Sequence, residues 1–326
     1  MQKFPTTAAQ LAIVSVLTAC ACCASAQQAY PTKPIRIIVP YATGGSTDIL
    51  ARLAGQKLNE AWGQPVVVDN RPGGTTTIGS QALVKSAPDG YTIMVMSVDH
   101  VIVPNLIATS FDAIKDFAPV ATISSGGLVM VLNPSVPANN LQEFIALAKS
   151  RPGGLNYASP GNGGVQNLAG EFLSILTGIK MQHIPYKGGG PAVIDLLGGQ
   201  VQMYLTPPVT VVSHIGTGKL RAIAISGEAR ASVLPQVPTF SEAGLPAFDV
   251  KTWFAVLAPG GAQKEVIGKL STEIARILRM PDVRERIASL GMEPFISTPD
   301  QFAALLEAEM AKFARIIKTA NIRLEH

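Results

Sequence analysis

Residues 35–48 read IRIIVPYATGGSTD, and this stretch decides the fold. It opens with a mostly continuous apolar run, as expected for a β-strand that is covered on both faces. Gly44 and Gly45 then permit a tight turn, and Ser46 is a residue type that commonly caps a helix. A helical pattern of apolar residues follows and stops at Gly63, a typical helix end. The stretch therefore predicts a buried strand that leads through a short loop into a helix.

The same alternation of apolar runs and amphipathic stretches continues along the chain. A second helical pattern ends at Gly178, again with a glycine as its stop signal. This rhythm predicts an α/β fold with mainly parallel sheets, and the length of 326 residues suits two domains. The runs that we expect to form strands are Ile35–Tyr41, Val66–Val68, Tyr91–Ser97, Leu128–Leu132, Leu155–Ala158, Val201–Leu205, Leu220–Ser226 and Thr252–Ala258.

The last third of the sequence is helical. A helix is expected over residues 262–279, with Pro281 as its stop, and Thr298-Pro299-Asp300-Gln301 has the cap, proline and capping-box glutamine of a helix start. Two long helices must pack on something already formed. We therefore expect the chain to return to its first domain after it has built a second.

The N-terminus has the layout of a secretory signal peptide over residues 1–26. Lys3 precedes a short apolar core, and the segment ends in Ala24-Ser25-Ala26, an A-x-A cleavage pattern. Leu17-Thr18-Ala19-Cys20 also resembles a lipobox, so cleavage before Cys20, which would give a lipid-anchored protein, is the alternative. At the other end, residues 324–326 resemble the remnant of an affinity tag.

All three cysteines, Cys20, Cys22 and Cys23, lie in this leader. A chain cleaved after Ala26 would contain no disulfide, thiol nucleophile or cysteine metal site. An export signal on a cysteine-free domain predicts a periplasmic location.

The composition and the motifs exclude several classes of protein. Charged residues make up 15% of the chain and hydrophobic ones 47%, a composition that argues against disorder. The net charge is +4, and the basic residues are scattered along the sequence, which argues against nucleic-acid binding. The histidines have no metal-ligand spacing, and there is no G-x-S-x-G motif. We expect no catalytic residue, no metal and no cofactor.

Two strand-to-helix loops, Tyr41–Asp48 and Ser159–Gly164, are candidate anion sites. The free N–H groups of a helix's first turn attract anions, so two such loops that face each other across a cleft would suit a ligand with one or two carboxylates. The alternative is that each is a plain turn rich in Gly and Ser. Asp48 would repel an adjacent carboxylate, unless it only favours the helix N-terminus.

Ser97 and His100 follow another strand end, where open α/β sheets place their ligands. His100 could donate a hydrogen bond to a ligand oxygen. Alternatively, it is a structural histidine that is bonded to the backbone.

Several stretches, in this order, carry a resemblance to one family: YPTKPIRIIVPYATGGSTDILAR (30–52), GQPVVVDNRPGG (63–74), LAGEF (168–172), HIPYKGGGPAVIDLLGGQV (183–201) and LPQVPTFSEAGLPAFDV (234–250). They resemble the Bug family, the extracytoplasmic receptors of tripartite tricarboxylate transporters. The resemblance implies a type II periplasmic-binding-protein fold, in which two crossover strands join two α/β lobes and the ligand cleft lies between them. We expect a first lobe over 27–126 and 253–323 and a second lobe over 127–252.

The resemblance also implies a function. The partners would be a small carboxylate and a membrane permease of the tripartite tricarboxylate type, and we expect a monomer. Backbone amides and bound waters of the two loops would hold one carboxylate. The candidate ligand-binding residues are Tyr41, Thr43, Gly44, Gly45, Ser46, Thr47, Asp48, Ser97, His100, Ser159, Asn162, Gly163, Gly164 and Thr206.

One departure from the family bears on the ligand. Thr206 stands where the family commonly ends a strand with Asp, and the loss of that charge should leave room for a second anionic group. If Thr206 lies at the pocket wall, a dicarboxylate, or an aromatic acid of the phthalate type, becomes the favoured ligand, and an amino acid, whose ammonium group would pair with that Asp, is not expected. A co-receptor for a sensor kinase and a periplasmic α/β enzyme are the competing functions.

Overall fold

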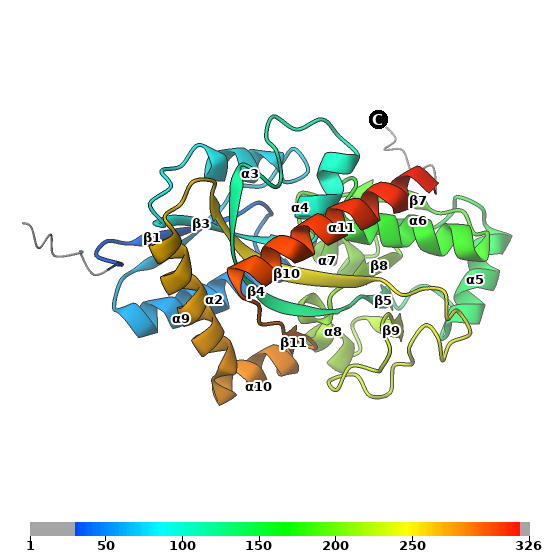
Figure 1. Cartoon of the computed structure of the whole chain (residues 1–326). Coiled ribbons are helices and arrows are strands. Elements are labelled where there is room, and N and C mark those ends of the chain that lie inside the picture. The colour runs from blue at the N-terminus through cyan, green and yellow to red at the C-terminus, as the bar shows by residue number, and fades with distance from the viewer. Residues whose placement is uncertain (1–29, 320–326) are drawn as a thin grey trace, which may run out of the picture. The chain divides into compact units, whose positions relative to one another are not determined.

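The computed structural model describes residues 30–319 (Figure 1). The predicted signal peptide, the three cysteines and the expected tag remnant lie outside the described residues. The fold described below belongs to residues 33–319.

The first sheet has six strands within this part of the chain, in the order β11-β4-β10-β3-β1-β2. Strands β2, β1 and β3 are parallel, whereas β10 is antiparallel to both β3 and β4. The strands are β1 (Ile35–Val39), β2 (Val66–Asn70), β3 (Thr92–Ser97), β4 (Phe117–Gly127), β10 (Lys251–Pro259) and β11 (Glu293–Pro294).

The second sheet has five strands in the described chain, in the order β7-β6-β8-β5-β9. Strands β7, β6 and β8 are parallel, and β5 is antiparallel to β8 and β9. The strands are β5 (Val129–Leu132), β6 (Asn156–Ser159), β7 (Gln182–Pro185), β8 (Met203–Thr206) and β9 (Arg221–Ile225).

The expectation of mainly parallel sheets is wrong, because both sheets are mixed. The cause lies in the connection between the sheets. Strand β4 carries the chain towards the second sheet and β10 carries it back, so the two crossover strands run in opposite directions and pair antiparallel. We call the six-stranded sheet with its helices the first lobe and the five-stranded sheet with its helices the second lobe. The lobe boundaries at 127 and 252 stay a prediction.

Each of the eight apolar runs overlaps a strand, but β4, β7 and β11 had no such signal. Strand β4 reads FAPVATISSGG and β7 reads QHIP, so small and polar residues interrupt the apolar pattern. Strand β4 forms without a continuous apolar run because it pairs with a neighbour on each side, β10 and β11. Backbone hydrogen bonds to these two strands stabilise its 11 residues.

The helices begin and end close to the sequence signals. Gly63 and Gly178 are left-handed C-caps, and Thr298 and Gln301 exchange the two hydrogen bonds of a capping box at the start of the last helix. The helices are α2 (Ser46–Trp62), α3 (Thr77–Val84), α4 (Asp99–Ile102), α5 (Leu141–Ser150), α6 (Val165–Thr177), α7 (Gly189–Leu197), α8 (Val212–Gly216), α9 (Lys264–Arg279), α10 (Pro281–Ser289) and α11 (Pro299–Thr319).

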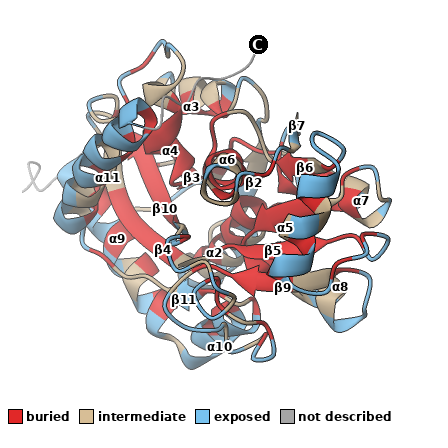
Figure 2. Cartoon of the chain, turned by 90° about the vertical axis from the view of Figure 1, so that its right-hand side faces the viewer, coloured by how far each residue is buried: buried red, intermediate tan, exposed pale blue. Residues whose placement is uncertain are grey.

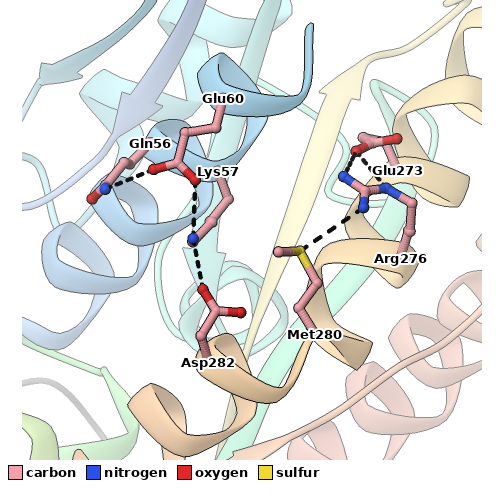
Figure 3. Close-up of polar contacts among 7 residues, drawn as sticks. All are labelled: Gln56, Lys57, Glu60, Glu273, Arg276, Met280 and Asp282. Carbon is pink, nitrogen blue, oxygen red and sulfur yellow. Dashed lines mark hydrogen bonds and ion pairs between the residues drawn. The ribbon is translucent and has the colours of Figure 1, made fainter.

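Apolar packing positions these helices on the sheets. Figure 2 shows the strands of both sheets largely buried and the helices exposed on their outer faces. Helices α9 and α11 pack against β4, so the C-terminal helices do return to the first sheet, as expected. On the surface, Lys57 of α2 donates to Glu60 and to Asp282 of α10, at 2.9 and 2.8 Å (Figure 3). Such exposed pairs contribute little to stability, because solvent screens them.

Candidate functional site

The loops β1–α2 and β6–α6 have the same backbone conformation. Gly44 and Gly163 have φ of 82° and 74°, in the left-handed region that favours glycine. Gly45 and Gly164 follow as extended N-cap residues, with φ/ψ of −83°/170° and −77°/169°. The chain therefore makes the same glycine turn into a helix in each lobe.

A side chain four residues further on closes each turn. The Gly44 N–H donates to Asp48 Oδ2 and the Gly163 N–H donates to Asn167 Oδ1, both at 2.9 Å. The expectation that Ser46 caps α2 is therefore wrong: Gly45 occupies the N-cap position without a side-chain cap, and the Asp48 carboxylate binds the preceding glycine instead.

The charge of Asp48 is compensated locally. Its carboxylate forms an ion pair with Arg52 at 2.9 Å and accepts a hydrogen bond from the Asn70 amide at 2.9 Å. Burial acts to raise the pKa of Asp48, but the bonds from Arg52, Gly44 and Asn70 outweigh it and hold the pKa below its ordinary value. Asp48 does not line the cavity described next, and its charge is paired with Arg52.

A cavity of about 20 Å³, room for about one water, lies where loops of the two lobes meet. It is lined by Tyr41, Gly45, Ser46, Thr47, Ser97, Asp99, Pro160, Gln166, Gly189, Tyr204 and Phe254.

Three helix N-termini converge on this cavity. Gly45, Ser46 and Thr47 belong to the start of α2, Gln166 to the first turn of α6, and Gly189 is the first residue of α7. First-turn N–H groups and the helix dipole both favour negative charge at such a position. The arrangement can therefore hold an anion.

The start of α7 is not among the candidate ligand-binding residues expected from the sequence, although Lys187-Gly188-Gly189-Gly190 leads into it. Its glycines let the backbones of two loops touch: a Cβ on Gly190 would lie 2.0 Å from the Thr43 carbonyl oxygen. The Ala42 N–H also donates to the Lys187 carbonyl at 2.9 Å. Three glycines directly before a helical apolar pattern are the signal that could have indicated this contact.

Asp99 is the main site residue that sequence reasoning missed. Only 3% of this residue is exposed to solvent. Asp99 Oδ1 accepts the N–H of Val165, the first residue of α6, at 2.8 Å, and Oδ2 accepts the Tyr41 hydroxyl at 2.7 Å. A Cβ on Gly164 would lie 2.9 Å from Oδ2, so the glycine is needed for this approach. The carboxylate of one lobe thus occupies the helix N-terminus of the other.

Burial dominates the electrostatics of Asp99. It raises the pKa of this carboxyl, and the hydrogen bonds from Val165, Tyr41 and Ser97 offset it only in part. No cation of the described chain forms an ion pair with Asp99. Burial, followed by the Asp99 charge, also raises the pKa of Tyr41 well above its usual range. Asp99 lies two residues past the strand end that pointed to Ser97 and His100, but nothing in the sequence indicated its contact with Val165.

His100 and Thr206 do not line the cavity. His100 Nε2 lies 2.8 Å from the Ala113 carbonyl, its ring packs edge-on against Phe117, and burial lowers its pKa to about 4. This is the structural alternative considered for that residue. Thr206 is fully buried, and its Oγ1 lies 2.9 Å from Thr210 Oγ1, so the structure does not place it at the pocket wall.

Ser159 and Asn162 belong to the second loop. Ser159 Oγ donates to the Gly161 carbonyl at 2.7 Å and lies 2.6 Å from His183 Nε2, so it stabilises the conformation of the loop. Asn162 lines a neighbouring cavity of about 200 Å³ together with Thr75, Lys187 and Tyr41, and Tyr41 lines both cavities.

Of the residues expected from the sequence, the first cavity brings together Tyr41, Gly45, Ser46, Thr47 and Ser97. Thr43, Gly44, Asp48, Gly163 and Gly164 build the two turns instead of lining the cavity. The lining residues that were not expected are Asp99, Pro160, Gln166, Gly189, Tyr204 and Phe254.

Residues 50–322 match the family model described as the tripartite tricarboxylate transporter family receptor. The chain belongs to this family. Protein BugT of Bordetella pertussis is 38% identical over 320 residues, which cover 97% of this chain and 98% of BugT.

Solved structures agree with this assignment. The periplasmic binding protein BugD has a TM-score of 0.87 and 30% identity, covering 91% of this chain and all of BugD. The protein Rpa4515 of R. palustris, solved with adipate, has a TM-score of 0.87 and 30% identity, covering 90% of this chain and 99% of that one. The expected fold of two α/β lobes joined by crossover strands is confirmed.

Two other kinds of feature are not found in the described part of the chain. Residues 30–319 contain no group of three or more His, Cys, Asp or Glu side chains that could hold a metal ion. In the same residues, no helix is both long and apolar enough to cross a membrane.

Proposed function

We propose that the protein is a periplasmic solute-binding protein that captures a small carboxylate and delivers it to a membrane permease of the tripartite tricarboxylate type. The observation that carries this proposal is the convergence of three helix N-termini on one cavity, where two of them, α2 and α7, face it with uncapped glycine-rich starts. Backbone N–H groups that are already fixed by helices bind an anion without a further cost of ordering.

Membership of a transporter-receptor family supports the delivery role, and the adipate in the Rpa4515 structure supports a carboxylate ligand. The predicted signal peptide supports a periplasmic location. We propose that the ligand contacts the cavity-lining loop residues of both lobes and that the lobes are 27–126 with 253–323, and 127–252.

The expected preference for a dicarboxylate or a phthalate-type acid depended on Thr206 at the pocket wall. Thr206 does not line the cavity, whereas Asp99 adds a carboxylate to its lining. The proposed function is therefore limited to small carboxylates, and the ligand class is argued below from Asp99.

The test is a thermal-shift screen of mono-, di- and tricarboxylates against the purified protein. A ligand present at about 100 times its Kd should stabilise the folded state by about 2.7 kcal/mol. Recovery of the bound acid unchanged after incubation separates a receptor from an enzyme. Loss of its uptake in cells that lack this gene but retain the permease separates delivery from signalling. No shift with any carboxylate would reject the proposal.

A further inference from the structure

We propose that Asp99 determines which carboxylates this site accepts: it occupies the anion position of α6 and thereby requires a hydrogen-bond donor on the ligand. The ligand class is then a carboxylic acid that carries an ammonium or hydroxyl group beside its acid group. This inference rests on the proposed function and narrows its ligand.

The first step is that one of the three anion positions is already filled. Asp99 Oδ1 accepts the Val165 N–H at 2.8 Å, which is where a ligand carboxylate would bind at the start of α6. The Tyr41 hydroxyl, at 2.7 Å from Oδ2, holds the carboxylate in this position. A ligand carboxylate is therefore left with the starts of α2 and α7.

The second step is that the cavity has two chemically different sides. The starts of α2 and α7 present backbone N–H donors. Asp99 and Gln166 also line the cavity and supply acceptor oxygens, and Gln166, which is only 8% exposed, has an Oε1 atom without a hydrogen-bond partner. A buried acceptor without a partner is unfavourable, so the site is complete only when a ligand brings a donor to it.

The third step is the cost of the wrong ligand. A second carboxylate about 4 Å from Asp99 would be repelled, and effective dielectric constants between about 80 and 20 give a loss of affinity of roughly five- to several-hundred-fold. An ammonium group at the same place would instead compensate a buried carboxylate that has no ion pair in the described chain. A hydroxyl group would supply the donor without the charge.

The experiment is calorimetric titration with two sets of acids that share a carbon skeleton: succinate, malate and aspartate, and propionate, lactate and alanine. Adipate, which a relative binds, is a further acid without a donor. The variants are Asp99→Asn and, as a control with the same change of charge on an exposed side chain, Glu60→Gln. All titrations use one ionic strength, since salt screens the repulsion.

We expect the wild type and Glu60→Gln to bind the donor-bearing acid of at least one set more than about tenfold more tightly than its donor-free partner. In Asp99→Asn that ratio should fall to a few-fold, mainly because the donor-free acid binds better. If Asp99→Asn does not fold, the ratio in the wild type decides alone.

The outcomes separate the two proposals. Equal affinity within each set for the wild type, or a donor preference that survives Asp99→Asn, overturns the role of Asp99 and leaves the carboxylate receptor standing. If no acid of either set binds but other carboxylates do, the ligand class is wrong. If no carboxylate binds at all, both proposals fail.

Discussion

At the scale of single residues, two buried carboxylates of the site have opposite electrostatic environments. Asp48 is 3% exposed but is bonded to Arg52, Asn70 and the Gly44 N–H, and its pKa is lowered. Asp99 is equally buried and has only neutral donors, and its pKa is raised. The first carboxylate therefore stabilises the folded loop in its charged form, whereas the charged form of the second costs stability that ligand binding can recover.

This contrast predicts opposite dependences of stability on pH. A lowered pKa in the folded state means that Asp48 contributes stability above its unfolded value near pH 4 and loses it as the pH falls through the folded value. Asp48→Asn should therefore destabilise by about 1–3 kcal/mol at neutral pH, and less in acid. A raised pKa means that charged Asp99 costs stability as the pH rises through its unfolded value, so the stability of Asp99→Asn relative to the wild type should be higher at neutral pH than in acid.

Urea unfolding of the wild type and both variants, at neutral pH and near pH 4, measures the two differences. The account would be contradicted if the stabilities of the two variants, each relative to the wild type, shifted in the same direction between neutral pH and pH 4.

The sequence indicated the residues of the site that lie on regular patterns, and it missed those that depend on distant contacts. Ser46 and Thr47 were predictable because a strand, a glycine turn and a helix follow one another in the sequence. Asp99 was not, because its role depends on Val165, which lies 66 positions away and in the other lobe. The placement of Thr206 was missed for the same reason. Its hydroxyl lies beside that of Thr210, a contact that the sequence did not indicate.

At the scale of elements, the loop between β2 and α3 is unusual. Thr75 and Thr76 have φ of 49° and 76°, a region that β-branched residues rarely adopt, and they follow two glycines that also have positive φ. Thr75 lines the 200 Å³ cavity beside Asn162. Backbone conformations of this kind cost about 1–2 kcal/mol per residue and tend to occur where a loop serves a ligand.

Neighbouring threonines allow a matched test of this strain. Thr75→Gly relieves a cost of about 1–2 kcal/mol and adds the usual glycine cost of about 0.5–1 kcal/mol, so stability should stay constant or rise slightly. Thr77 is the first residue of α3, and its hydroxyl donates to the Gly74 carbonyl at 2.7 Å. Thr77→Gly should therefore destabilise by about 1–2 kcal/mol. Denaturant midpoints measure both, and a larger loss for Thr75→Gly would disprove the strain.

At the scale of the whole molecule, one contact between the two lobes is made by the backbone of two loops. Ala42–Gly45 of the first lobe lies against Lys187–Gly190 of the second, with one hydrogen bond from the Ala42 N–H to the Lys187 carbonyl. Only glycine permits this close approach of the two backbones. The fold could be predicted from the family motifs in the sequence. This contact could not, because it depends on how the two lobes meet.

The last prediction concerns Gly190. A Cβ at this position would lie 2.0 Å from the Thr43 carbonyl oxygen, a backbone atom that cannot move without its loop. Alanine is otherwise suited to the first turn of α7, so the second lobe itself should fold normally. We expect Gly190→Ala to hold the lobes apart, to enlarge the radius of gyration measured by X-ray scattering with ligand, and to weaken carboxylate binding by at least about tenfold.

Gly198→Ala, at the other end of α7, is the control, because the nearest atom to its added Cβ would be at 3.5 Å, an ordinary contact. It should bind like the wild type. Circular dichroism should show unchanged helix content in both variants, which separates blocked closure from unfolding. The opposite outcome is that Gly190→Ala binds the ligand as tightly as Gly198→Ala does. In that case the ligand-bound state does not contain the contact between Gly190 and Thr43. The ligand then binds in a cleft that is wider than the one where the starts of α2 and α7 meet.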